Sequence, residues 1–310
     1  MKKTPLVSVC MITYKHEQYI AQAIESVLMQ NTDFPIELII GEDAGPDGTR
    51  GICEAYQAQY PDIVRVLPAE KNMGFAKNFI RTLFAAQGRY IALLDGDDYW
   101  TDPAKLQKQA DFLEKNEAYN LVFHNVHLLK YGKMDGLVYP GSRKEVISIA
   151  DILNHDYTQT CAIMFRSEPL SKIPVAEAAQ WIYNDITLFS LLLSNGTLGR
   201  YFPEVMSTYR VHEGGVWSMV DIRKKYFMSR QAEDIIIDKY YPTDSLKRLI
   251  TKREAVFYKY YAVEMLKKLE VGLMLSTSFR FVQWSALDLV AKFRRPAAPR
   301  NSLPPAALPA

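Results

Sequence analysis

Cysteine and long hydrophobic runs are scarce in this sequence, and their scarcity excludes several classes of protein. Only three of the 310 residues are cysteine, at positions 10, 53 and 161, and no two of them form a C-x-x-C pair. This excludes a disulfide framework and a thiolate zinc site and favours a reducing, cytoplasmic compartment. No uncharged apolar run reaches the roughly 18 residues of a transmembrane helix, and the N-terminal apolar run has no small-residue cleavage site, so we expect no signal peptide.

Two glycine-rich nucleotide-binding motifs are also missing. No G-x-G-x-x-G follows the first predicted strand, where Lys15, His16 and Glu17 stand instead, which disfavours a nicotinamide oxidoreductase. The absence of G-x-x-x-x-G-K-[ST] excludes a P-loop phosphotransferase.

The chain carries little net charge, but its charge is unevenly distributed. The net charge is +2, yet residues 1–220 hold 20 Lys and Arg against 26 Asp and Glu, whereas residues 221–310 hold 17 against 9. Near neutrality argues against nucleic acid as the main partner. The basic C-terminal third is compatible with contact to an anionic membrane surface.

Apolar, β-branched runs alternate with helical patterns over the first hundred residues. Strands are predicted at 6–13, 36–40, 63–67 and 90–94, and helices at 17–30, 49–60 and 76–87. This alternation predicts an α/β fold with a mostly parallel, Rossmann-like sheet flanked by helices. Ligands of such sheets bind beyond the carboxyl ends of the strands.

The remaining sequence divides into three parts. A helix at 103–116, a strand at 121–127 and a helix at 185–194 are predicted to complete a first domain over 1–220. Residues 221–295 have a helical pattern and are predicted to form a C-terminal helical region. Residues 296–310 are rich in proline and alanine and are predicted to be a disordered tail.

Acids follow two of the predicted strands. Asp95, Asp97 and Asp98 come directly after the strand at 90–94, where their mutual repulsion indicates a bound hard cation, Mg²⁺ or Mn²⁺. The alternative is a solvated Asp-Gly turn. Glu42 and Asp43 end the strand at 36–40 and, if the strands are parallel, lie at the same edge; turn and capping roles account for residues 47 and 49 but not for these two acids.

Five motifs, in this order and spacing, resemble the inverting family-2 glycosyltransferases of GT-A fold. The resemblance covers about residues 5–215. It rests on Val7-Ser8-Val9 leading to Thr13-Tyr14, the segment Ala23-Ile24-Glu25-Ser26-Val27-Leu28-Met29-Gln30, Glu42-Asp43 with Asp47-Gly48-Thr49, Asn72-x-Gly74 with Asn78, and Asp95-Gly96-Asp97-Asp98.

The resemblance implies a donor-binding role for residues at several strand ends. Thr13 and Tyr14 would border the nucleotide, with Tyr14 against the uracil, and Asp43 would read the pyrimidine. Glu42 stands where the family usually has Asp. The donor-binding set is completed by Asn72, Lys77, Asn78 and Asp95, and for Lys77 and Asn78 the alternative is an exposed helix face.

The resemblance also implies a metal site and a catalytic base. Asp97 matches the D-x-D acid that holds a metal-bridged diphosphate, Asp98 is an alternative ligand, and His212 in a Tyr-Arg-x-His segment is a third candidate, although a lone histidine is often structural. Asp185 matches the base that deprotonates the acceptor. The alternative for Asp185 is an acid favoured by the dipole at a helix start.

The expected function is therefore transfer of a hexose or N-acetylhexosamine, with inversion, from a nucleoside-diphosphate sugar such as a UDP-sugar. The acceptor would be a glycan or a lipid-linked glycan in the synthesis of cell-surface polysaccharide or lipopolysaccharide. A non-catalytic nucleotide-sugar or glycan-binding module is the alternative. Residues 272–295 form an apolar, basic-flanked pattern that either packs on its own domain or contacts the inner face of the membrane.

Overall fold

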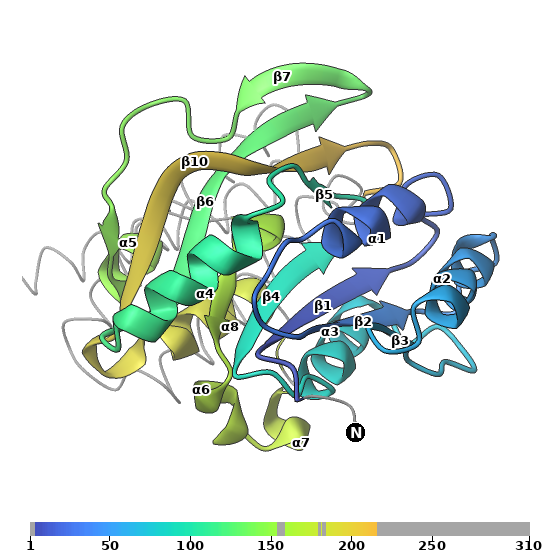
Figure 1. Cartoon of the computed structure of the whole chain (residues 1–310), viewed down its shortest axis with the longest axis horizontal. Helices are drawn as coiled ribbons and strands as arrows, with labels where there is room; N and C mark the ends of the chain where they lie inside the picture. Colours follow the sequence, from blue (N-terminus) through green and yellow to red (C-terminus); the bar gives the residue numbers. More distant parts are fainter. Residues whose placement is uncertain (1–3, 154–158, 179–180, 182–183, 216–310) are drawn as a thin grey trace, which may run out of the picture. The chain divides into compact units, whose positions relative to one another are not determined.

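A computed structural model describes residues 4–153, 159–178, 181 and 184–215 (Figure 1). The predicted helical region 221–295, its candidate membrane segment 272–295 and the predicted tail 296–310 lie outside the described residues. The fold below is that of the first predicted domain.

The N-terminal half follows the predicted alternation of strands and helices closely. Its elements are β1 (Val7–Thr13), α1 (Ile20–Leu28), β2 (Ile36–Glu42), α2 (Thr49–Gln59), β3 (Val64–Val66), α3 (Phe75–Phe84) and β4 (Tyr90–Asp95). The apolar positions spaced at three and four residues along α1 are buried, as the helical period requires. The predicted α/β fold class is confirmed.

The second half contains shorter and less regular elements. They are β5 (Tyr99–Trp100), α4 (Lys105–Lys115), β6 (Tyr119–Lys130), β7 (Lys133–Leu137), β8 (Val146–Ile147), α5 (Ile149–Leu153), η1 (Thr160–Ala162), β9 (Met164–Arg166), α6 (Glu168–Ser171), α7 (Val175–Ala178), α8 (Asn184–Leu192), η2 (Ser194–Gly196) and β10 (Leu198–Val211). Among these, α4, β6 and α8 were predicted.

The strands form one ten-stranded sheet whose order runs β3-β2-β1-β4-β9-β6-β10-β5, with β7 beside β6 and β8 beside β10. β1 is parallel to β2 and β4, and β10 is parallel to β6. β9 is antiparallel to both β4 and β6, so the direction is restored across it. The sheet is therefore parallel up to β4 and mixed beyond it, and β6 and β10 end at the same edge as β1, β2 and β4.

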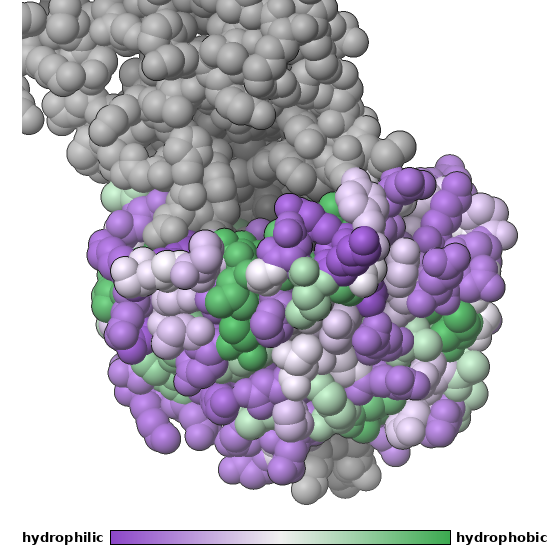
Figure 2. Space-filling view, turned by 90° about the horizontal axis from the view of Figure 1, so that it is seen from above, coloured by the Kyte–Doolittle hydropathy of each residue, from purple (hydrophilic) through white to green (hydrophobic). Residues whose placement is uncertain are grey.

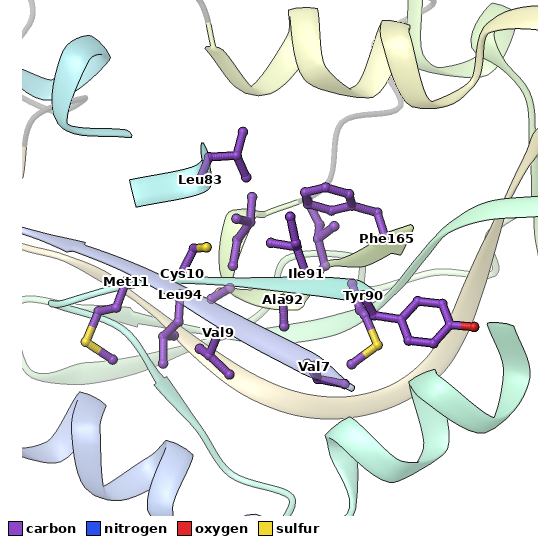
Figure 3. Close-up of a cluster of buried hydrophobic side chains, with 14 of the residues drawn as sticks. Val7, Val9, Cys10, Met11, Leu83, Tyr90, Ile91, Ala92, Leu94 and Phe165 are labelled. Atoms are coloured by element: carbon purple, nitrogen blue, oxygen red, sulfur yellow. The ribbon is translucent and has the colours of Figure 1, made fainter. Parts of the chain in front are cut away.

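The core lies on both faces of the central strands (Figure 3). Cys10 and Ile91 point toward Leu83 of α3, whereas Val9 and Met11 point to the opposite face, in the alternation that a strand imposes. α3 and α8 cover one face, and α1 and α4 cover the other. Each fully buried aliphatic side chain contributes about 1.5–3 kcal/mol, and this core supports the polar groups at the carboxyl edge.

The face of the described residues seen in Figure 2 is predominantly hydrophilic. On the face seen in Figure 2, hydrophobic residues form separate groups between hydrophilic ones. None of the described helices has the length and apolar character needed to cross a membrane.

Candidate active site

The register of the central strands brings the predicted acids to one edge of the sheet. Thr13 at the end of β1 lies opposite Glu42, and the preceding residue, Ile12, lies opposite Asp95. Neighbouring strands are about 4.8 Å apart, so the residues that follow β2 and β4 flank the end of β1. The parallel topology thus places Asp43 and Asp95 at a common edge, as the sequence led us to expect.

Glu42 is the residue that closes the turn after β2. Its side chain is fully buried, and its carboxylate accepts the N–H groups of Ala44 at 3.1 Å and Gly45 at 2.7 Å. Arg50 lies 3.4 Å from the same carboxylate. Ala44 has a φ of 53°, a left-handed conformation that L-residues rarely adopt and that this carboxylate helps to hold. The donor contact expected of Glu42 stays a prediction, and in the structure its carboxylate is enclosed by its own turn.

Asp43 holds the loop that leads into α3. It is only 3% exposed, and its two carboxylate oxygens accept the N–H groups of Met73 at 2.8 Å and Gly74 at 2.9 Å. The Asn72 side chain donates to the Asp43 carbonyl oxygen at 3.0 Å. Asp43 and Asn72 therefore join the turns after β2 and before α3, and each carboxylate oxygen keeps one further lone pair for a ligand.

Asn78 and Lys77 are neighbours on α3 but occupy opposite environments. Asn78 is buried, its amide donates to the Gly41 carbonyl oxygen at 2.6 Å, and its side-chain oxygen accepts from Arg81 at 2.8 Å. The donor contact expected of Asn78 stays a prediction, and in the structure both ends of its amide bind inside the protein. Lys77 is exposed and remains available to a ligand.

The end of β4 and the end of β1 are in close contact. A Cβ on Gly96 would lie 2.6 Å from the Thr13 hydroxyl oxygen, so only glycine fits between Asp95 and Asp97 in this conformation. Thr13 is 3% exposed, and its hydroxyl has no hydrogen-bond partner among the described residues. Asp95 is half-buried and accepts a hydrogen bond from Thr160 at 2.7 Å.

Asp97 meets two histidines from distant parts of the chain. Its Oδ2 lies 3.0 Å from Nε2 of His212 and 3.7 Å from Nε2 of His16. One ligand atom from each of the three residues lies within 4.8 Å of the other two. His16 precedes α1 and His212 follows β10, so this cluster is assembled by the parallel course of β1, β4 and β10.

The protonation of this cluster follows from burial and proximity. Burial raises the pKa of Asp97, but the hydrogen bond with His212 and the neighbouring His16 outweigh it, so the pKa lies below its ordinary value. Burial lowers the pKa of His16, although the charge of Asp97 opposes this. Asp97 is therefore an anion and His16 a neutral ring at physiological pH, the forms in which both bind a metal.

Asp98 lies outside this cluster. It is 1% exposed, and its Oδ1 accepts the backbone N–H of Arg210 at 2.8 Å. Burial, reinforced by the charges of Asp97 and Asp95, raises the pKa of Asp98 well above its ordinary value. The predicted metal role of Asp98 stays a prediction, and in the structure its Oδ1 fixes the end of β10.

Arg210 fastens β10 to the loop after β4. Its Nη1 donates to the carbonyl oxygen of Asp97, and its Nη2 donates to Gln22 of α1 at 2.7 Å. The guanidinium lies 4.4 Å from the ring centroid of Tyr19 and 5.3 Å from that of Tyr99. Because β5 also pairs with β10 at Thr208–Tyr99, the loop that carries Asp97 is held on two sides.

A cavity of about 350 Å³ adjoins the histidine cluster. Its lining includes aromatic rings, a guanidinium, a carboxylate and backbone atoms of the turn between β6 and β7. The lining residues are Tyr19, Tyr131, Gly132, Arg210, Val211, His212, Glu213 and Gly214.

Two further predicted site residues are Tyr14, which follows β1, and Asp185, which lies in α8. Tyr14 is 37% exposed, which leaves its ring free to stack on a base. Asp185 lies in the first turn of α8, but its side chain lies outside the described residues.

The residues present fit a divalent transition ion. Asp97 supplies an anionic oxygen, and His16 and His212 supply imidazole nitrogens, which is a donor set that transition ions accept and that Mg²⁺, with its preference for oxygen, accepts less well. Nothing in the sequence indicates His16 as a site residue, and Arg210 was included only as part of the Tyr-Arg-x-His segment, without a role of its own. His16 lies in a predicted loop far from the acids along the chain, so no spacing signal links it to Asp97.

The family of the chain follows from comparison with known proteins. The model of glycosyl transferase family 2 matches residues 8–169, more than half of the chain. The chain belongs to glycosyl transferase family 2.

Individual similarities span different shares of the chain. An uncharacterized protein of Mycobacterium tuberculosis is 35% identical over 226 residues, which are 72% of this chain and 64% of that protein, so the chain spans less than two thirds of this relative. The minor teichoic acid biosynthesis protein GgaB of Bacillus subtilis is 28% identical over 214 residues, 68% of this chain and 24% of GgaB.

The fold also has counterparts among solved structures. The crystal structure of TarS 1-349 of S. aureus in complex with UDP is similar with a TM-score of 0.65 and 18% identity, over 90% of this chain and 80% of that one. At this identity the likeness concerns the fold alone, and it agrees with the predicted fold class.

Proposed function

We propose that this protein transfers a sugar, with inversion, from a nucleoside-diphosphate donor, a UDP-sugar, to an acceptor hydroxyl. The observation that carries the proposal is the meeting of Asp97 with two imidazoles at the carboxyl edge of the sheet, in a chain of glycosyl transferase family 2. The edge of an open α/β sheet is where such folds bind ligands.

The donor would lie across the ends of β1, β2 and β4. Tyr14 offers an exposed ring to the base, and Asp43 offers its remaining lone pairs to the base or the ribose. The half-buried carboxylate of Asp95 would bind the ribose, and the buried Thr13 hydroxyl at the end of the neighbouring strand, without a partner among the described residues, would be a second contact. Lys77 is the exposed cation of α3 that would reach a phosphate or the sugar.

Asp97 and His212 would hold a divalent ion, Mn²⁺ or Mg²⁺, beside the diphosphate. When bound, the ion neutralises the negative charge that builds on the departing diphosphate. Asp97 brings one charge toward the ion and Arg210 fixes the loop that carries it. Because this loop is already fixed before the donor binds, less entropy is lost when the donor is positioned.

Asp185 would act on the acceptor. Its carboxylate takes the proton of the acceptor hydroxyl as the oxygen forms a bond to the anomeric carbon, while the bond from that carbon to the diphosphate oxygen breaks on the opposite face. A single displacement inverts the configuration.

The acceptor would be a glycan or lipid-linked glycan of a cell-surface polymer, such as a polysaccharide or a teichoic acid. The name of GgaB, one of the similar proteins, supports this class. A peripheral position on the inner face of the membrane would suit such an acceptor.

The proposal is tested with the full chain and a panel of UDP-, GDP- and dTDP-sugars. One nucleotide class should raise the melting temperature in the presence of Mn²⁺, since a ligand of the native state stabilises it, and the nucleoside diphosphate should be released slowly even without acceptor. Loss of both effects in EDTA would support a metal-dependent transferase. Stabilisation without any release of diphosphate would indicate a binding module, and no stabilisation by any donor would contradict the proposal.

A further inference from the structure

His16 is a buried histidine whose ring nitrogens have no hydrogen-bond partner in the described part of the chain. It is 7% exposed, and its Nδ1 is enclosed without a partner. Its Nε2 has Asp97 as its nearest acid, at 3.7 Å, beyond the roughly 3.2 Å limit of a hydrogen bond. Buried polar side chains are normally paired, so the Nε2 atom, which faces Asp97 without a hydrogen bond, is open to a ligand that the protein itself does not supply.

The distances around Asp97 fit atoms that share one ion. Two ligand atoms at about 2.1 Å from an ion lie about 3.0 Å apart at a right angle and about 3.4 Å apart at a tetrahedral angle. Asp97 Oδ2 lies 3.0 Å from His212 Nε2 and 3.7 Å from His16 Nε2, and all three atoms lie within 4.8 Å of one another. The longer distance is wrong for a hydrogen bond but close to the separation of two ligands of one ion.

We propose that His16 is a third ligand of the cation held by Asp97 and His212, and that it makes this site select a first-row transition ion such as Mn²⁺ over Mg²⁺. The inference rests on the proposed function in one respect, the role of the bound ion beside the diphosphate; the binding of the ion is argued from the geometry of the cluster. It concerns a residue that the motif resemblance did not include.

The protein holds the His16 ring in place without help from an ion. The backbone N–H of His16 donates to the buried Thr49 hydroxyl at 2.9 Å, and its carbonyl oxygen accepts the N–H groups of Tyr19 and Ile20, both at 2.8 Å. The ring meets the edge of Tyr19 with centroids 6.4 Å apart and that of His212 with centroids 5.9 Å apart. A ligand that is already positioned loses little freedom when the ion binds.

Selectivity follows from the kinds of ligand atom. A carboxylate serves Mg²⁺ and Mn²⁺ alike, whereas each imidazole nitrogen favours transition ions, because Mg²⁺ prefers oxygen and gives up its water reluctantly. One imidazole with Asp97 would leave the preference small. Two imidazoles and one carboxylate form the donor set that is typical of transition-ion sites.

The decisive measurement counts the nitrogens on bound Mn²⁺. The full chain is labelled with ¹⁵N-histidine, loaded with Mn²⁺ without donor or acceptor, and measured by electron spin echo envelope modulation. Two histidine nitrogens are expected in the wild-type protein and one in His16→Ala. A single nitrogen in the wild-type protein would overturn the inference without recourse to any variant.

Affinity provides a second readout. His16→Ala should weaken Mn²⁺ binding about tenfold or more, measured by calorimetry, and change Mg²⁺ binding less than about twofold, so the preference for Mn²⁺ narrows by the same factor. His127→Ala, on β6 outside the cluster, is the control and should leave both affinities unchanged. Equal losses for Mn²⁺ and Mg²⁺ would assign His16 a purely structural role.

The outcome is separable from the proposed function. If Mn²⁺ carries two histidine nitrogens but no donor is cleaved, the inference stands and the proposed function fails. If metal-dependent transfer occurs with one histidine nitrogen on Mn²⁺, the inference alone fails. Should His16→Ala not fold, His16→Gln keeps the volume of the side chain and the same nitrogen count decides.

Discussion

The turns after β2 and after β4 both begin with acids at the end of a buried strand, and they use those acids in opposite ways. After β2, the carboxylates of Glu42 and Asp43 accept backbone N–H groups of the same turn and of the loop before α3. After β4, Asp97 faces side chains instead, the two imidazoles of His16 and His212.

The backbone around each acid accounts for the difference. The left-handed φ of Ala44 accompanies amides that point toward Glu42, so the first turn neutralises its own charge. The carboxylate of Asp97 in the second loop also faces two imidazoles, and it lies 3.0 Å from the ring of His212, 115 positions further along the chain. Glu42 is held by the amides of its own turn, whereas Asp97 also meets imidazoles that can share a cation with it.

The largest expected effect comes from Asp97→Ala, which removes the only carboxylate of the histidine cluster. Transfer measured as kcat/KM should fall about 10²–10³-fold, since the charge on the departing diphosphate loses its counter-ion. The melting temperature without metal should stay within a few degrees. Asp111→Ala, an exposed acid of α4 outside the site, serves as the control. Undiminished transfer in Asp97→Ala would mean that the loop after β4 does not hold the cation and that the two turns do not differ in function.

Asp185→Asn should have the next largest effect, because it removes the proposed base of the acceptor hydroxyl. This residue lies in α8, outside the two turns compared above. We expect kcat to fall by about 10²-fold or more while the affinity for the nucleotide stays within about twofold. Single-turnover rates and nucleotide titration measure the two quantities separately. Near-normal turnover would mean that Asp185 has no part in the mechanism and that the proposed site consists of the strand-end residues alone.

The regular half of the fold could be predicted from the sequence, and the irregular half could not. β1 and β4 are buried on both faces and appear as nearly continuous apolar runs. β9 has only three residues, and β10 shifts its register between Phe202 and Val205, where Pro203 and Glu204 interrupt the pattern. Neither strand has a readable period, and β9 is the element that runs antiparallel between β4 and β6.

The site shows the same limit. Resemblance placed Asp97 and His212 in one site, because their motifs are local. It also predicts that Glu42 and Asn78 contact the donor, and their burial depends on contacts with Gly45 and Gly41 that no motif encodes. His16 became visible only when the parallel strands brought the start of α1 beside the loop after β4.

Glu42→Gln is predicted to affect stability rather than chemistry. The amide keeps one acceptor but loses the charge that faces Arg50 and two backbone N–H groups, which should lower the free energy of unfolding by about 1–3 kcal/mol. Urea denaturation measures this loss. Glu54→Gln removes the exposed partner of the same Arg50 and should cost at most about 1 kcal/mol. Equal costs for the two variants would mean that the turn does not depend on its buried acid.

The last expected effect is a dependence of stability on pH, and it arises beneath the second loop, at Lys105 of α4. Its Nζ is fully buried, lies 4.1 Å from the ring centroid of Trp100 on β5 and donates to Gln109 at 2.8 Å. Burial lowers the pKa of Lys105 to about 7. The first turn meets its buried charge with backbone amides, whereas here the charge is removed by release of a proton.

The consequence is a stability that depends on pH in a defined direction. Between about pH 7 and pH 10 the unfolded chain keeps the proton on Lys105 and the folded chain does not, so stability rises with pH by at most about 1.4 kcal/mol per unit. Below pH 7 both states are protonated and this contribution is constant. Urea denaturation of the wild-type protein and Lys105→Met from pH 6.5 to 9.5 should therefore give a difference in unfolding free energy that favours the variant most at low pH and shrinks as pH rises. A difference independent of pH would mean that Lys105 stays charged in the fold, held by Trp100 and Gln109.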